Sequence, residues 1–350
     1  KFNSSGEKQW TRLIGSSDND VGHSLTIGSD GSIYIAGHTE GDLDGQTNSG
    51  GEDIFISKFN TNGLKQWTKF VGVYGYYNKQ DLEIDIGIDD SIYITGNTLR
   101  DLDGSTNNGG YDAFISKFNS NGDKQWSTLL GSSKYEFGHG ITTGNDGSIY
   151  ITGYTEGDLE GQTNGGDKDA FISKFNSSGE KQWTRLVGGS ENEEGYAITI
   201  DDDESIYITG DTESDLDGET NHLIRNTFIS KFNNDGEKQW TRLLEREQFD
   251  WRHSSKTAYD IASVEKNSIY ITGYSIGDLN EETLIGGYDA FISKFNSEGE
   301  RQWCELLGTS EDEEGYAITI DDDASIYITG YTEGDSDGQT NNGGKDAVIG

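Results

Sequence analysis

The chain has 350 residues, and its 26 lysines and arginines against 63 aspartates and glutamates give a formal net charge of −37. So large a negative charge repels phosphate backbones and anionic membrane surfaces, which excludes nucleic-acid binding as a general function. Apolar residues make up 31% of the chain, and no run of them approaches the roughly 18 residues of a membrane-spanning helix, so no membrane insertion is expected.

One unit recurs along the chain with a spacing of 57 to 63 residues. Its most regular marker is a Gln-Trp pair, whose tryptophans are Trp10, Trp67, Trp126, Trp183, Trp240 and Trp303. A Ser-Ile-Tyr-Ile segment recurs with the same count, and a Phe-Ile-Ser-Lys-Phe-Asn segment occurs five times. A sixth copy of that last segment is split between the two ends of the chain, at residues 346–350 and residues 1–3. A single domain over residues 1–350, built from six repeats, is therefore expected.

Each repeat predicts four short strands, and the stretch from residue 170 onward shows them in chain order. Residues 170–175 and 181–186 are β-branched and aromatic runs joined by an Asn-Ser-Ser-Gly turn. Residues 196–200 and 205–209 follow, joined by an acidic turn at residues 201–204. Runs of this kind bounded by Gly, Asn, Asp and Ser are typical of strands and tight turns, and no stretch sustains a helical period.

Four strands in each of six repeats predict an all-β fold, a β-propeller of six four-stranded blades. The split sixth copy predicts a ring closed by the N-terminal strand of Trp10, which pairs with residues 348–349 in the last blade and removes the free sheet edge. The alternative is that these 350 residues are part of a longer array of repeats.

One repeat resembles a known family closely. Its parts are the Asp112–Gly122 segment, Gln125-Trp126, Leu129-Leu130-Gly131 and a Gly-Ser-Ile-Tyr-Ile-Thr-Gly motif ending at Gly153. This unit resembles the bacterial SBBP repeat, the family named for the seven-bladed β-propeller, and the likeness covers nearly the whole chain. The six repeats here depart from the seven of the name. The resemblance implies an extracellular or cell-surface bacterial protein, and it implies no shared enzyme activity.

The loop after each Ser-Ile-Tyr-Ile segment carries an acidic pattern, Glu-x-Asp-x-Asp-Gly-x-x-Asn in its fullest form. The pattern is similar to the calcium loops of integrin α propellers, and calcium prefers six to eight hard oxygen ligands. The candidate calcium ligands are Glu40, Asp42, Asp44, Asn48, Asp101, Asp103, Asn107, Glu156, Asp158, Glu160, Asn164, Glu213, Asp215, Asp217, Asn221, Glu333, Asp335, Asp337 and Asn341. The alternative is turn chemistry, because Asp and Asn beside Gly often hydrogen-bond only their own backbone.

A second candidate site lies where the first strand of each repeat begins, nine residues before the serine of the Ser-Ile-Tyr-Ile segment. Most of these positions carry polar aromatic side chains that would line the central channel: His23, His139, Tyr196, Tyr259 and Tyr316, with Leu82 in the second copy. Their variation between copies indicates recruitment for binding. A packed plug of the channel is the alternative, and two histidines are a weak metal signal.

The loops between repeats differ most from copy to copy, and diverging loops on a rigid scaffold often bind ligands. Their aromatic residues could stack on a sugar ring while nearby carboxylates bind its hydroxyls. The candidates are Tyr76, Tyr77, Tyr135, Phe249 and Trp251. Drift of exposed loops is the alternative explanation.

A repeated segment, Asn-Ser-Ser-Gly-Glu-Lys-Gln-Trp where it ends at Trp10, is similar to the tryptophan-docking motif of quinoprotein propellers. The likeness is structural and implies no quinone. No organic cofactor is expected. The single cysteine, Cys304, cannot form an intramolecular disulfide and is expected to be incidental.

The sequence therefore predicts a non-enzymatic extracellular binding module with calcium on its acidic loops and a protein or glycan as ligand. Two alternatives remain open. One is a carbohydrate-active hydrolase or lyase whose site at the channel mouth uses Asp250 and His253, and the other is an inert structural spacer. The oligomeric state is not predicted.

Overall fold

A computed structural model describes the chain except for residues 4–6, 75–81, 245–254, 265–266, 280–283, 322, 337, 342 and 350. The described residues form strands and turns, with no α-helix among them, and none could cross a membrane as a helix. The strands are β1 (Asp20–Ile27), β2 (Ile33–Thr39), β3 (Asp53–Phe59), β4 (Lys65–Tyr74), β5 (Glu83–Ile86), β6 (Ile92–Thr98), β7 (Asp112–Phe118), β8 (Lys124–Leu130), β9 (Glu136–Thr143), β10 (Ile149–Thr155), β11 (Asp169–Phe175), β12 (Lys181–Val187), β13 (Glu193–Ile200), β14 (Ile206–Thr212), β15 (Asn226–Phe232), β16 (Lys238–Leu243), β17 (Ser255–Val264), β18 (Ser268–Ile276), β19 (Asp289–Phe295), β20 (Arg301–Leu307), β21 (Glu313–Ile320), β22 (Ile326–Thr332) and β23 (Asp346–Ile349).

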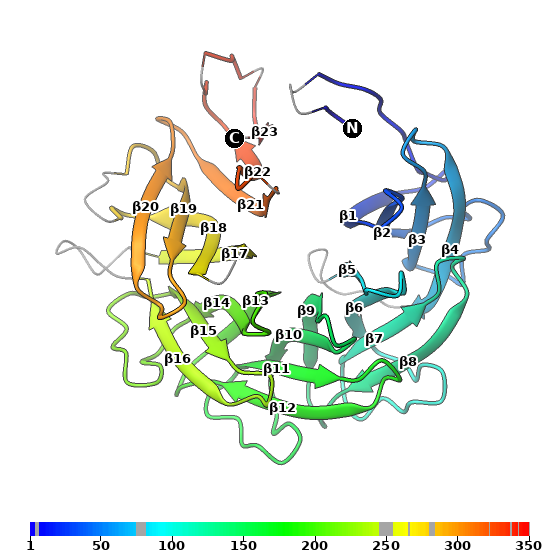
Figure 1. Ribbon diagram of the computed structural model, residues 1–350, viewed down its shortest axis with the longest axis horizontal. Coiled ribbons are helices and arrows are strands. Elements are labelled where there is room, and N and C mark those ends of the chain that lie inside the picture. Colours follow the sequence, from blue (N-terminus) through cyan, green and yellow to red (C-terminus); the bar gives the residue numbers. More distant parts are fainter. Residues whose placement is uncertain are drawn as a thin grey trace. The chain divides into compact units, whose positions relative to one another are not determined.

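These strands form six antiparallel sheets, and each sheet takes its strands consecutively from the chain (Figure 1). Five sheets have four strands, from β1-β2-β3-β4 to β17-β18-β19-β20. Each sheet corresponds to one sequence repeat, and the expected fold, a six-bladed β-propeller, is confirmed. We refer to the sheets as blades one to six in chain order.

Blade six has three strands, β21-β22-β23, where four were expected. The sequence predicts its fourth strand around Trp10, but in the described structure Phe2 bridges Lys8 and the Lys1 ammonium group donates to the Trp10 carbonyl. The third-strand motif of blade six is split between the two ends of the chain. Lys1 and Phe2 precede Trp10 directly, whereas residues 346–349 lie at the other end.

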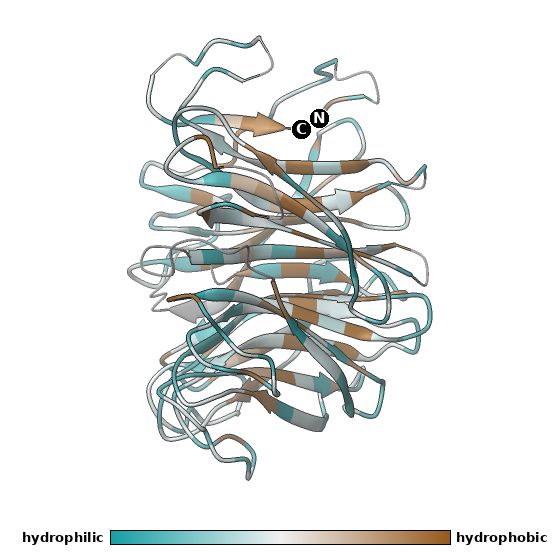
Figure 2. Cartoon of the chain, turned by 90° about the vertical axis from the view of Figure 1, so that its left-hand side faces the viewer, coloured by the Kyte–Doolittle hydropathy of each residue, from teal (hydrophilic) through white to brown (hydrophobic). Residues whose placement is uncertain are grey.

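The chain divides into two compact units, one of residues 1–151 and 175–182 and the other of residues 152–174 and 183–350. The core of the first unit includes Tyr34, Ile94 and Phe114, and the core of the second includes Tyr207, Ile271 and Phe291. These residues come from the central strands of the blades, and Figure 2 shows hydrophobic residues, in brown, along the strands.

The repeated tryptophans pack against glycines in the turn between the third and fourth strands of the next repeat. In the first unit Trp10 meets Gly63, and in the second Trp183 meets Gly236, whose φ is +75°. A Cβ atom on Gly236 would lie 2.7 Å from the Trp183 ring. The glycine therefore serves both the turn and the close approach of the indole.

Candidate functional site

Four of the six first-strand positions singled out in the sequence lie on β-bulges. The pairing of β13 with β14 skips Tyr196, that of β17 with β18 skips Tyr259, and that of β21 with β22 skips Tyr316. In β1 the skipped residue is His23. A bulge leaves one residue out of the ladder and redirects its side chain, which is why bulges often lie beside functional sites.

Two further positions vary between otherwise similar repeats, and the sequence reasoning missed both. One follows the glycine of the Ser-Ile-Tyr-Ile-Thr-Gly motif on the second strand of each blade, and the other directly precedes the third strand. The second-strand residues are His38, Asn97, Tyr154, Asp211, Tyr274 and Tyr331, and their partners before the third strand are Glu52, Tyr111, Lys168, Arg225, Tyr288 and Lys345. The available signal was a single changing residue within a nearly constant motif.

In the second unit these positions bring tyrosines together. Tyr259 lies at the centre, with its ring 5.7 Å from that of Tyr274, 5.7 Å from that of Tyr316 and 6.1 Å from that of Tyr196. Tyr274 meets Tyr288 edge-on at 5.6 Å, and Tyr316 lies 5.8 Å from Tyr331. We call these six residues the tyrosine cluster. Rings at such distances stabilise one another, and each hydroxyl remains available for a polar contact.

Charged groups surround one side of this cluster. The Tyr196 hydroxyl donates to Glu194 at 3.2 Å and to Asp211 at 3.0 Å. Arg225 bridges Asp211 and Glu213, each at 3.0 Å. Burial raises the pKa of Asp211 to about 7, because the low-dielectric site disfavours the carboxylate and Glu194 adds repulsion that Arg225 opposes. Burial and the Asp211 and Glu194 charges also raise the pKa of Tyr196 well above its ordinary value.

On the other side, the Tyr331 hydroxyl donates to Glu314 at 3.0 Å. Burial, followed by the Glu314 charge, raises the pKa of both Tyr259 and Tyr316. Glu314 therefore lies among three tyrosine hydroxyls. Tyr316 is 43% exposed, so this part of the cluster is open to a ligand.

In the first unit the same positions form a histidine pair. His23 Nε2 lies 2.7 Å from His38 Nδ1, with the rings stacked at 4.9 Å, and Glu52 lies 3.8 Å from His38 Nε2. His139 is buried, Leu82 is buried in the core, and Tyr135 is exposed beside the Tyr111 ring at 6.3 Å. The described part of the chain brings no three His, Cys, Asp or Glu side chains together as a metal site.

The acidic loops use their side chains for turns and ion pairs. Asp42 accepts from the Asn48 backbone at 2.8 Å, and the Asn48 amide donates to the carbonyls of Thr39 and Gly51 at 3.1 and 3.0 Å. The same Asp–Asn bond occurs in the loops of Asp101 and Asn107, Asp158 and Asn164, Asp215 and Asn221, and Asp335 and Asn341.

The second acids of these loops bond to the outer strand. Asp103 contacts Lys124 at 2.8 Å and Ser127 at 2.6 Å. Asp44 bonds Lys65 and Thr68, and Asp217 bonds Lys238 and Thr241. Glu160 shares with these aspartates a positive φ before the loop glycine.

The leading acids lie at the loop edges: Glu40 bonds Asn19, Glu213 bonds Asn192, Glu333 pairs with Lys345, and Glu156 is half-buried. These contacts favour turn chemistry, and calcium on these loops stays a prediction.

Several candidates fall outside the described residues. These are Tyr76, Tyr77, Phe249 and Trp251 of the loops between repeats, Asp337 of the acidic loops, and the Asp250 and His253 of the enzyme alternative.

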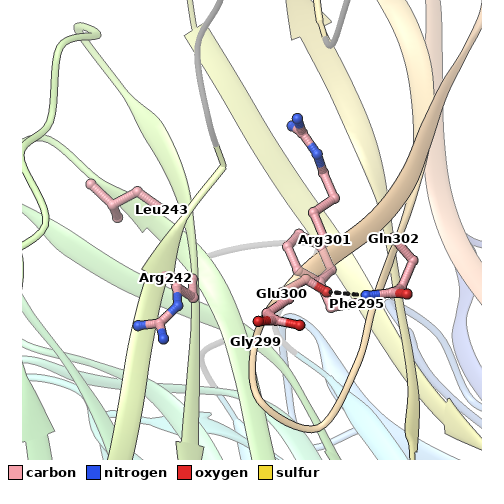
Figure 3. Close-up of a pocket in the computed structure, with 7 residues that line it drawn as sticks. All are labelled: Arg242, Leu243, Phe295, Gly299, Glu300, Arg301 and Gln302. Atoms are coloured by element: carbon pink, nitrogen blue, oxygen red, sulfur yellow. Dashed lines mark hydrogen bonds between the residues drawn. The ribbon is translucent and has the colours of Figure 1, made fainter.

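One cleft, of about 500 Å³, has a lining that repeats in nearly every copy. It lies between Arg242 and Leu243 of β16 and the hairpin that joins β19 to β20, where the Gln302 amide donates to the Glu300 carbonyl at 3.0 Å (Figure 3). Phe295, Gly299 and Gln302 have counterparts in the other complete repeats. We assign this cleft to the docking of one blade's hairpin on the preceding outer strand.

Comparisons with known proteins agree with this geometry. The family model described as a beta-propeller repeat, SBBP, matches residues 9–44, 125–160 and 182–217. Three segments of the chain thus match the SBBP repeat model. The chain is 21% identical to the regulatory protein FlaEY of Caulobacter vibrioides, over 98% of this chain and 40% of that protein. It is 22% identical, over 48% of its length, to 14% of an uncharacterized WD repeat-containing protein of Acanthamoeba polyphaga mimivirus. The chain thus spans less than half the length of these curated relatives.

Among solved structures, a protein of unknown function from Dyadobacter fermentans aligns over 96% of this chain and 95% of its own, with a TM-score of 0.55 and 12% identity. An α-L-arabinofuranosidase of Fusarium graminearum aligns over 96% and 98%, with a TM-score of 0.50 and 8% identity. At these identities the likeness shows the fold alone.

Proposed function

We propose that this chain is a non-enzymatic binding module, outside the cell or on its surface, that takes a protein or a glycan at the tyrosine cluster. The observation that carries the proposal is the convergence of the variable positions. The bulge residues, the second-strand residues and those before the third strand differ between copies, while the residues around them repeat.

The chemistry of the cluster supports binding. Tyrosine supplies a large apolar face and a polar tip, which suits recognition of a partner side chain or a sugar ring. The cluster stands on strands that are held in register on both sides, so its rings are positioned before a ligand arrives, and preorganisation reduces the entropic cost of binding. The extracellular location rests on the resemblance to SBBP-repeat proteins.

The test compares the native chain with a variant built from residues that the fold already accepts. Blade two has Leu82 and Asn97 where blade five has Tyr259 and Tyr274. The double variant Tyr259→Leu/Tyr274→Asn should remain folded and lose the ligands that the native chain binds on glycan and peptide arrays.

The control is Tyr327→Leu, which removes an exposed tyrosine (41%) that lies on β22 outside the cluster. This variant should keep the array ligands. Array binding that the double variant retains in full would rule out the tyrosine cluster as the ligand site.

A further inference from the structure

Blade three shows what the variable positions can hold. The Lys168 ammonium group lies 4.2 Å from the centre of the Tyr154 ring and 2.6 Å from Glu194 Oε1. An aromatic face and a carboxylate thus bind one cation from two sides, and both contacts are favourable for an ammonium group. Blade six places Lys345 similarly, 3.7 Å from the centre of the Tyr331 ring.

Blade five has the aromatic face and the carboxylate but no lysine. Tyr274 takes the place of Tyr154, Glu314 that of Glu194, and Tyr288 that of Lys168. Among the described residues Glu314 forms no ion pair. It accepts from the Tyr331 hydroxyl at 3.0 Å, and the hydroxyls of Tyr259 and Tyr316 lie beside it. A half-buried carboxylate among tyrosine rings is therefore bound by hydroxyl groups where blade three supplies a lysine, and the lysine of blade six, Lys345, lies over the Tyr331 ring and pairs with Glu333.

We propose that Glu314, with Tyr259, Tyr274 and Tyr316 around it, binds the ammonium group of a lysine side chain from a partner protein. The inference deepens the proposed function, on which it rests, by naming the chemical class of the ligand. The tyrosine faces attract the cation, the carboxylate pairs with it, and the partner lysine takes the role that Lys168 plays within blade three. The net charge of −37 favours the approach of a basic partner over an acidic one.

The probe is N-acetyl-lysine methylamide, titrated at low salt against the native chain, with N-acetyl-norleucine methylamide as the uncharged control. The lysine compound should bind and the norleucine compound should not. Glu314→Gln should weaken binding by about tenfold, because the variant keeps the shape of the site and loses the charge.

Two substitutions of one residue make a matched pair. Tyr288→Lys should abolish binding of the probe, because the new side chain occupies the site as Lys168 does in blade three. Tyr288→Phe should leave the affinity within about twofold, since the ring is retained. Melting curves of all variants check that the fold persists.

Equal affinity for the lysine and norleucine compounds, or unchanged affinity in both Glu314→Gln and Tyr288→Lys, would overturn the inference. The proposed function would survive that result if array ligands were still lost in Tyr259→Leu/Tyr274→Asn. If the variants lost neither the lysine probe nor the array ligands, both the inference and the proposed function would be rejected.

Discussion

The loop asparagines show how a single side chain can organise a turn through hydrogen bonds. Asn164 donates its amide to the Thr155 carbonyl at 2.9 Å, and its side-chain oxygen accepts from Gly166 at 2.9 Å. Its own backbone donates to Asp158 at 3.0 Å. The side chain thus closes the loop from both ends, which is a local use of Asp and Asn beside Gly that needs no metal.

Removing that side chain should therefore destabilise the blade. Asn164→Ala leaves buried backbone groups without partners, and we expect the free energy of unfolding to fall by about 1–3 kcal/mol in urea denaturation. Glu156→Ala, in the same loop, should change it little. Equal losses in both variants would contradict the hydrogen-bond account.

Melting curves with and without calcium distinguish directly between turns and ion sites in these loops. If they are turns, the melting midpoint should be the same in excess EDTA and in millimolar calcium, with magnesium as the control. A calcium-specific rise that disappears in Asp158→Asn would make the loops ion sites, because a ligand of the folded state must raise the midpoint.

Among the elements, the hairpin between the third and fourth strands joins one repeat to the next. In blade four its Gly236 lies against Trp183 of the preceding repeat, and Arg185 donates from Nε to the Gly236 carbonyl at 2.9 Å. Arg12 bonds the Gly63 carbonyl in the same way at 2.7 Å, beside Trp10. The repeated tryptophan is therefore structural, as its sequence motif indicated.

Two glycines of blade four distinguish the energetic contribution of the tryptophan contact from that of backbone strain. Gly236 (φ +75°) faces the Trp183 ring, whereas Gly218 (φ +88°) has open space around it. Gly218→Ala should cost about 1 kcal/mol for the left-handed backbone alone. Gly236→Ala should cost at least about 2 kcal/mol, because the methyl group also displaces the indole. Similar losses in denaturant unfolding would show that the tryptophan contact contributes little.

The strands and turns were predictable because the same β-branched and aromatic runs, bounded by the same turn residues, recur in every repeat. The tyrosine cluster was predictable only in part. Tyr196, Tyr259 and Tyr316 stood out by their variation, but their bulges depend on pairing with the second strand. Tyr259 and Glu314 come from different repeats, and their proximity follows from packing that no motif records.

For the whole molecule, buried carboxyl groups predict an unusual dependence of stability on pH. Burial raises the pKa of Asp112 to about 6 and that of Asp211 to about 7, both above the ordinary value of 3.8. The stability that such groups contribute is fully present below about pH 4 and is lost as pH rises through 6 to 7. Acidification also relieves the repulsion within a chain of net charge −37.

Other carboxyl groups oppose this trend at lower pH. Burial acts against them, but Lys124 and Ser127 hold the pKa of Asp103 below its ordinary value, so its contribution is lost as pH falls below about 4. The free energy of unfolding should therefore rise by on the order of 2 kcal/mol from pH 8 to about pH 5 and then fall. Asp211→Asn should reduce the change in the free energy of unfolding between pH 8 and pH 5, measured by urea denaturation. A monotonic loss of stability from pH 8 downward would contradict the assignment.

The most direct test of the tyrosine cluster as the ligand site is an NMR spectrum of the chain labelled with ¹³C in its tyrosine rings, with and without a ligand selected on the arrays. The repeats provide internal controls, because Tyr34, Tyr93, Tyr150 and Tyr207 are buried in the constant motif. We predict that the signals of Tyr259, Tyr274, Tyr316 and Tyr331 shift while those of the four buried tyrosines stay in place. Shifts confined to tyrosines outside the cluster would contradict the account.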